Sequence, residues 1–134
     1  MAKESGIGMT LTIDTSGGSG QAITDDVTNL SLSTTRNLQD VTGLADTTVE
    51  RLPLLADGSA QVNGVFDDAS NMEHDIFKNI ATNTASRTVV AAHSGQTLTM
   101  EMYFTDYALS RGQDGSLTFS APASLANSTS YGWS

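Results

Sequence analysis

Residues 96–122, QTLTMEMYFTDYALSRGQDGSLTFSAP, contain the strongest pattern in the chain. In the first part every second residue is apolar: Leu98, Met100, Met102 and Phe104 alternate with Thr, Glu and Tyr. A period of two is typical of a strand with one buried face, because successive side chains point to opposite faces of a sheet. The pattern therefore predicts a strand whose apolar face needs a partner.

Two shorter strands are expected after it. The first covers Tyr107–Ser110, and the second covers Ser116–Ala121, with Leu117 and Phe119 pointing inward. The sequence RGQDG between them contains an Asp-Gly pair, which suits a tight turn. Pro122 lacks a backbone donor and is expected to end the last strand. The three strands predict an antiparallel meander with an apolar face that the rest of the chain must cover.

The length and composition indicate one domain. A chain of 134 residues can bury a core of its own without disulfides or a structural metal. It has no cysteine, which excludes disulfides and thiolate chemistry. No apolar run approaches the roughly 20 residues that cross a bilayer. The first ten residues, MAKESGIGMT, do not resemble a secretory signal, so we expect a protein made and folded in the cytoplasm.

The charge argues against tight binding of nucleic acid. The chain has 15 acidic and 6 basic residues, a formal net charge of −9, and no basic cluster. Proteins that grip duplex DNA do so mainly through Lys and Arg. Ser and Thr make up 34 of the 134 residues, and both suit strand faces that are polar without being charged.

Further strands are expected before the meander. They cover residues 7–14, 22–35, 58–66 and 86–93. In the second of these, Val27 and Leu30 are out of register for strict alternation, which predicts a β-bulge near Thr28-Asn29. About seven short strands with one helix indicate a mainly β fold, either an antiparallel β-sandwich or a small barrel.

One α-helix is predicted, at about Asn71–Ile80. Ser70 with Glu73 three positions later has the form of a capping box. The apolar residues of the segment fall on one stripe, which should lie across an open edge or end of the sheets. These residues are Met72, Ile76, Phe77 and Ile80.

The segment Arg36–Asp57 matches neither a clean strand nor a long helix. Asp46 could cap a short helical turn over Thr47–Leu52, which Pro53 would end. Its large aliphatic residues make it unlike an ordinary polar loop, so it is either an exposed contact site or a flap over one end of the domain. These residues are Leu44, Val49, Leu52, Leu54 and Leu55.

No group of residues predicts catalysis or metal binding. His74 and His93 lie in the predicted helix and at a strand end, and the adjacent acids Asp25 and Asp26 would diverge on a strand. The glycine-rich stretch Ser16–Gly20 lacks the Lys-Ser/Thr of a phosphate-binding loop. We therefore expect no enzyme, no cofactor and no metal site.

A succession of short motifs gives a more specific indication. In chain order, most of the chain resembles the tail tube (major tail) proteins of long-tailed bacteriophages and gene transfer agents. The motifs are DVTNL at 26–30, QDVTGL at 39–44, ERL at 50–52, LAD at 55–57, NGVF at 63–66, HDIF at 74–77, FTDY at 104–107 and DGSLTFSAP at 114–122.

This resemblance implies a structural protein of the virion tail. It implies one β-sandwich domain of tail-tube type over residues 1–134, with a flanking helix and a long loop excursion at about 40–57. Six copies would form a ring, and stacked rings would form a tube through which DNA is ejected without specific binding. The excursion would join one ring to the next, which assigns ring stacking to Leu44, Val49, Leu52, Leu54 and Leu55.

The same resemblance implies partners and a lining for the tube. The partners are other copies of the chain and the tape-measure, tail-tip and terminator proteins, with no membrane span. Because the chain is acidic, we expect Asp and Glu side chains to line the bore.

Other functions remain open from the sequence. The chain could be another virion component, such as a head decoration protein, a tail terminator or the inner tube of a contractile system. It could also be a carbohydrate-binding β-sandwich, which would need exposed aromatic residues. The candidates for such residues are Tyr103, Tyr107, Tyr131 and Trp133.

Overall fold

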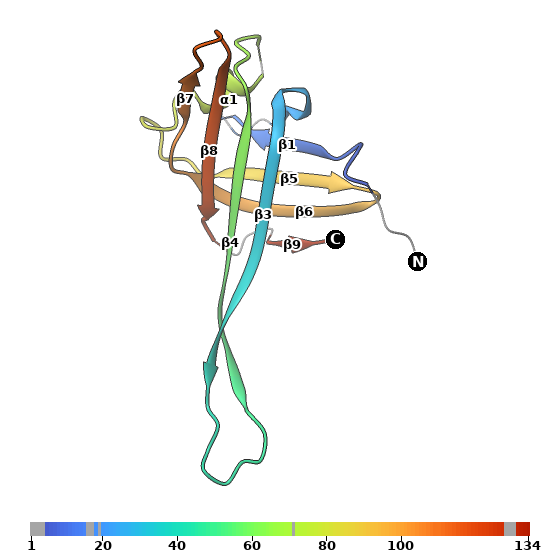
Figure 1. Cartoon of the computed structure of the whole chain (residues 1–134), viewed down its shortest axis with the longest axis vertical. Helices are drawn as coiled ribbons and strands as arrows, with labels where there is room; N and C mark the ends of the chain where they lie inside the picture. Colours follow the sequence, from blue (N-terminus) through green and yellow to red (C-terminus); the bar gives the residue numbers. More distant parts are fainter. Residues whose placement is uncertain (1–4, 16–17, 19, 71, 128–130) are drawn as a thin grey trace.

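The computed structural model describes residues 5–15, 18, 20–70, 72–127 and 131–134, and these residues form a mainly β structure, as the sequence predicts (Figure 1). The strands are β1 (Thr10–Asp14), β2 (Gly20–Ala22), β3 (Val27–Asp40), β4 (Arg51–Val65), β5 (Arg87–His93), β6 (Gln96–Phe104), β7 (Ala108–Arg111), β8 (Leu117–Leu125) and β9 (Gly132–Trp133). The helical elements are the 3-10 turn η1 (Thr24–Asp26) and the helix α1 (Glu73–Phe77).

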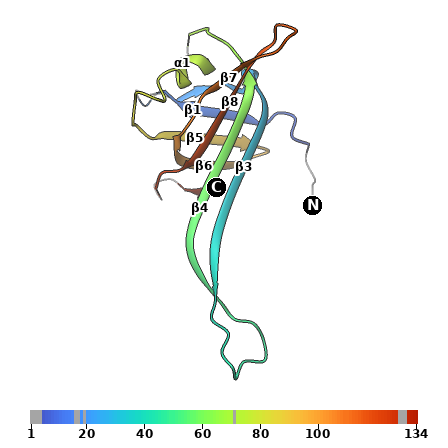
Figure 2. The same cartoon turned by 60° about the vertical axis from the view of Figure 1, so that its left-hand side comes forward.

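The strands join into one antiparallel sheet that folds over on itself. Its order is β2-β1-β5-β6-β8-β4-β3, with β7 paired to β8 and β9 paired to β6. Strands β3, β4 and β8 cross β5 and β6 at a steep angle in both views (Figures 1 and 2). The sheet turns this corner where β6 pairs with β8, between Met102 and Leu125 and between Phe104 and Ala123. The result is an orthogonally packed two-layer structure.

The core lies between the two layers. The predicted face of β6 is buried, and its residues Leu98, Met100 and Met102 are at most 1% exposed. The opposite layer contributes buried residues of β4 and β8 to the core, such as Val62 and Phe119. The alternation along β6 therefore identifies the inner face correctly, because a strand of a two-layer structure buries only the face that points toward the other layer.

The helix α1 covers one end of this core. Its residues Ile76 and Phe77 are fully buried, and the Phe77 ring lies 5.0 Å from Phe104 and 5.8 Å from Phe119. The helix spans Glu73–Phe77, which is shorter than predicted. No helix among the described residues is long and apolar enough to span a membrane.

The predicted capping box is wrong. Asn71, the predicted first residue of the helix, lies outside the described residues, and the N-cap is Met72, without a side-chain cap. The Glu73 side chain is buried and accepts hydrogen bonds from the hydroxyl of Tyr107, at 2.7 and 3.0 Å. Glu73 thus bonds to Tyr107, which is distant in the sequence, and not to the nearby Ser70 as the capping box suggests.

The meander also differs from the prediction. Strands β6 and β7 share one edge of β8, and β4 pairs with the other. Strand β8 continues through Pro122 to Leu125, although Pro122 was expected to end it. The carbonyl of Pro122 accepts a hydrogen bond from the backbone N–H of Thr105, in the gap between β6 and β7. The missing donor of Pro122 points to the same gap, where no strand needs it.

The longest element is the hairpin of β3 and β4. The bulge predicted near Thr28-Asn29 is present, as a register shift between Val27 and Asn29. The predicted helical turn over Thr47–Leu52 is absent, because β4 begins at Arg51. The excursion predicted at 40–57 is therefore a strand from residue 51 onward, and only residues 41–50 form a loop.

Aspartate at Met102 tests the strand register. We expect Met102→Asp to unfold the domain, because it places an unpaired carboxylate in the core at a cost of several kcal/mol. The neighbouring substitution Tyr103→Asp is the matched control, since Tyr103 is 48% exposed on the opposite face. Circular dichroism and thermal unfolding measure both variants. A folded Met102→Asp protein, or equal losses in the two, would contradict the register.

Candidate assembly interface

A projecting arm is the most prominent surface feature. Strand β4 pairs with β8 only from Ser59 onward, whereas its pairing with β3 continues to Arg51. Residues 34–57, here called the arm, therefore extend as a two-stranded ribbon and loop away from the domain (Figures 1 and 2). An isolated two-stranded hairpin is marginally stable in water, so the arm lacks support that a neighbour could supply.

The arm is unusually apolar for an exposed element. All five residues predicted to contact another copy lie on it, with Leu44 fully exposed and Leu55 82% exposed. Val49, Leu52 and Leu54 are between 41% and 57% exposed. The structure therefore does not fold these residues back as a flap over the domain. Leu38 and Val41 are also exposed on the arm and are not among the predicted contact residues, although Leu38 continues the alternation of β3.

A second bulge places apolar side chains on both faces of the arm. Between the pairs Arg36–Ala56 and Leu38–Pro53, β4 contains one residue more than β3. An extra residue on one strand reverses the alternation beyond it. Pro53 thus shares a face with Leu38, and Leu52 lies on the other face. A single surface on one side of the arm could not cover both sets.

The tip of the arm is held by local hydrogen bonds. The hydroxyl of Thr42 accepts from the N–H of Glu50 at 2.8 Å, and Asp46 accepts from the N–H of Gly43 at 2.6 Å. Hydrogen bonds from Thr42 also lower the pKa of Asp40. These contacts define the loop that carries Leu44, the most exposed large apolar residue among those that the structure describes.

The C-terminal segment packs at the base of the arm. The hydroxyl of Tyr131 donates to the carbonyl of Asp57 at 2.6 Å, and a groove there is lined by Leu55, Leu125 and Tyr131. Trp133 pairs through its backbone with Leu98 of β6. Tyr131 is therefore packed against the domain, whereas Trp133 stays 58% exposed.

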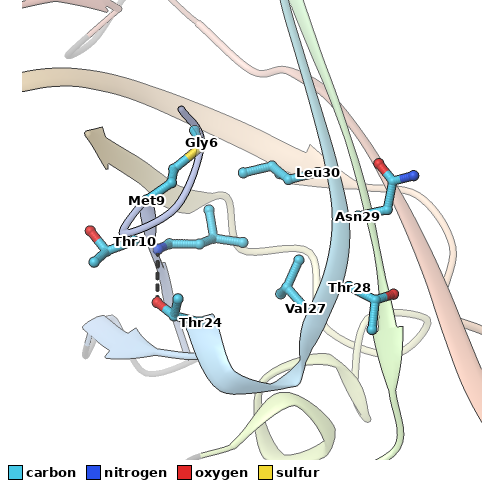
Figure 3. A pocket seen from close by; sticks show the side chains of 9 residues that line it. Gly6, Met9, Thr10, Thr24, Val27, Thr28, Asn29 and Leu30 are labelled. Carbon is cyan, nitrogen blue, oxygen red and sulfur yellow. Dashed lines mark hydrogen bonds between the residues drawn. The ribbon is translucent and has the colours of Figure 1, made fainter. Parts of the chain in front are cut away.

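A second groove lies between β1 and β3. Figure 3 shows that the side chains of Met9, Val27 and Leu30 point into it, while those of Thr28 and Asn29 point to the other side of β3. Within the described residues β3 pairs on one edge only, with β4. The groove therefore lies beside a long free edge, which could accept another strand.

A buried polar cluster anchors α1. Glu73 accepts from Tyr107 and from the backbone N–H of Asp67 at 3.3 Å, and its own N–H donates to Asp26 at 3.3 Å. Nδ1 of His74 lies 3.2 Å from the Tyr107 hydroxyl. Burial raises the pKa of both Glu73 and Asp26, and burial with the nearby Glu73 raises that of Tyr107.

The polar groups of this cluster bond to one another. The side chain of Glu73 is fully buried, and its hydrogen bonds are made within the protein. In the part of the chain that the structure describes, no three His, Asp or Glu residues are placed to hold a metal ion. We interpret the cluster as the attachment of α1 to the domain.

Comparison with solved structures gives the same architecture in two chains. One is from the tail of an empty gene transfer agent particle, in a helical refinement with C6 symmetry: TM-score 0.73, 18% identity, and 98% of each chain covered. The other is from the virion of a native gene transfer agent particle: TM-score 0.74, 16% identity, with 94% of this chain and 96% of that chain covered. At these identities the likeness concerns the fold. No family model and no curated protein matches the sequence.

The buried carboxylate makes stability depend on pH. Because burial raises the pKa of Glu73, the native state binds that proton more tightly than the unfolded chain. The stabilisation of the native state by protonated Glu73 is full below the unfolded-state pKa of this group. It is lost as the pH rises through the higher folded-state pKa. We expect urea unfolding of the wild type to show this loss as the pH rises above about 4, and Glu73→Gln to show a smaller one. Parallel profiles for the two proteins would contradict this role of Glu73.

Proposed function

We propose that this chain is the tube-forming structural protein of a phage-like or gene transfer agent tail. In this proposal its copies form rings, with six copies the expected number, and the rings stack into a tube that conducts DNA. The observation that carries the proposal is the exposed apolar arm. The likeness to chains from gene transfer agent tails over nearly the whole length supports it.

The arm supports contact between rings. Monomeric soluble proteins rarely leave a contiguous group of large apolar side chains in water, and such groups mark interaction sites. Leu44 and Leu55 are almost fully exposed, and Leu38 and Leu52 lie on opposite faces of the arm. An arm enclosed between copies would cover both faces. We therefore assign ring stacking to Leu44, Val49, Leu52, Leu54 and Leu55, and add Leu38 and Val41.

The free edge of β3 supports contact within a ring. This strand is 14 residues long and has charged side chains only at Arg36 and Asp40. Long, weakly charged edges pair readily with other strands. The groove beside it exposes part of the core, at Met9 and Val27. A neighbouring copy at this edge would extend the sheet and cover the groove.

The remaining elements of the proposal concern the particle. The protein is located in the virion tail after synthesis in the host cytoplasm. Its partners are other copies of itself and, at the ends of the tube, tape-measure, tail-tip and terminator proteins. DNA passes without specific binding, consistent with a net charge of −9, and no catalytic activity is assigned.

Charged substitutions on the arm test the proposal. We expect Leu52→Asp and Leu55→Asp to leave the domain folded and to raise the concentration needed for assembly at least tenfold, equivalent to about 1.4 kcal/mol or more per contact. Sedimentation measures assembly, and thermal unfolding measures folding. Thr84→Asp adds the same charge at an exposed position outside the arm, in the loop after α1, and serves as the control.

Two results would count against the proposal. If Leu52→Asp and Leu55→Asp assemble like the control, the arm does not join the rings. If both variants lose their fold, these residues support the domain itself and their exposure has another cause.

A further inference from the structure

We propose that the apolar groove between β1 and β3 receives the tip of the arm, residues 41–50, from a copy in the next ring. Leu44 is the side chain that enters the groove. The inference rests on the tail-tube function proposed above and names the surface that the arm contacts. The partner is therefore a second copy of this chain, bound through two different surfaces.

The groove is an opening into the core between the two layers. Within the described residues β1 and β3 belong to different layers and do not pair with each other. The side chains of Met9, Val27 and Leu30 point into the opening (Figure 3), and Leu11, which is 2% exposed, also lines it. Apolar side chains beside an open space lack the dispersion contacts that a filling group would supply.

The size and polarity of the groove fit a leucine side chain. Its volume is about 180 Å³. An apolar cavity of roughly 150 Å³ can hold a molecule as large as benzene, so the isobutyl group of leucine has room in the groove. All the described residues that line it are uncharged. A leucine that enters it therefore leaves water without burying a charge.

The tip of the arm carries a matching side chain on a well-defined loop. Residues 41–45, VTGLA, contain no charged residue, although the chain has a net charge of −9. Leu44 is fully exposed in this loop. The hydrogen bonds described above hold the loop on both sides of Leu44. Little conformational freedom is therefore lost when the tip enters a partner.

The groove and the tip lie at opposite ends of β3. This strand begins at Val27, which lines the groove, and ends at Asp40, from which the tip continues (Figures 1 and 2). A contact between two different surfaces leaves each copy with a free tip at one end and a free groove at the other. Such a contact adds copies end to end, as the stacking of rings requires.

A neighbour within the ring completes the site. A copy paired to the free edge of β3 covers the groove from outside, so the inserted tip lies between two copies. This arrangement accounts for the apolar side chains on both faces of the arm, such as Leu38 and Leu52. One face contacts the copy whose groove is filled, and the other contacts its neighbour.

Cysteine substitutions test the contact, because the chain has no cysteine of its own. Tubes of Leu44→Cys/Val27→Cys are oxidised and then separated under denaturing, non-reducing conditions. We expect a ladder of linked copies that continues beyond the six expected in one ring, since each disulfide joins a copy to one in the next ring. Leu44→Cys/Leu109→Cys is the matched control and should give no ladder, because Leu109 is exposed on β7, outside the groove.

A larger side chain in the groove gives an independent test. Val27→Trp occupies part of the space that Leu44 would enter. We expect it to raise the concentration needed for assembly about tenfold or more and to leave the thermal unfolding temperature of the monomer unchanged or higher. Leu109→Trp adds the same side chain outside the groove and should assemble like the wild type.

Other results would overturn the inference and leave the tube function standing. A ladder that stops at six copies would place the contact within the ring, and a disulfide within one copy would mean that the arm reaches its own groove. Oxidised tubes without disulfides, an equal ladder from the control, or normal assembly of Val27→Trp would mean that the tip binds elsewhere. Failure of the wild type to form rings or tubes would instead overturn the function and this inference with it.

Discussion

Strand β4 extends beyond the strand β8 that supports it, and this difference determines which apolar side chains remain exposed. Strand β4 has 15 residues, but β8 supports only the part from Ser59 onward. Beyond that point β3 and β4 have only each other, and their leucines have no layer to pack against. The domain therefore buries the inner face of the ribbon near the core and leaves the same ribbon exposed in the arm. Burial of those leucines requires another molecule.

Apolar residues are distributed differently in the two halves of the β3–β4 hairpin. Near the core, alternation places Leu30 and Leu32 inward and Ser31 and Ser33 outward, as in any half-buried strand. Along the arm, the bulge between Arg36 and Leu38 changes the register and distributes apolar residues over both faces. One continuous element thus has a neutral polar face at one end and an apolar contact surface at the other.

Local sequence patterns predicted the structure correctly where the residues that determine it are close together in the sequence. The buried face of β6 and the bulge at Thr28 follow from the period of two and its interruption. Prediction failed where a distant residue decides. Glu73 looked like a capping residue but bonds to Tyr107, 34 positions away. Pro122 continues β8 because its missing donor faces a gap that only the assembled sheet defines.

The candidate contact surface was predictable in its residues but not in its form. The apolar composition of Leu44 to Leu55 identified the segment, because large aliphatic side chains are rare in polar loops. The sequence left open whether they fold back or project. That choice depends on where β8 stops pairing with β4, which no pattern within residues 36–57 reveals.

The central claim is that residues 34–57 serve contact between copies. A cryo-electron microscopy reconstruction of the assembly formed by the purified wild-type protein tests it most directly. The account predicts stacked rings in which the arm of each copy lies against the next ring, with Leu44, Leu52 and Leu55 covered. An assembly with these side chains in solvent, or an arm folded onto its own domain, would contradict it.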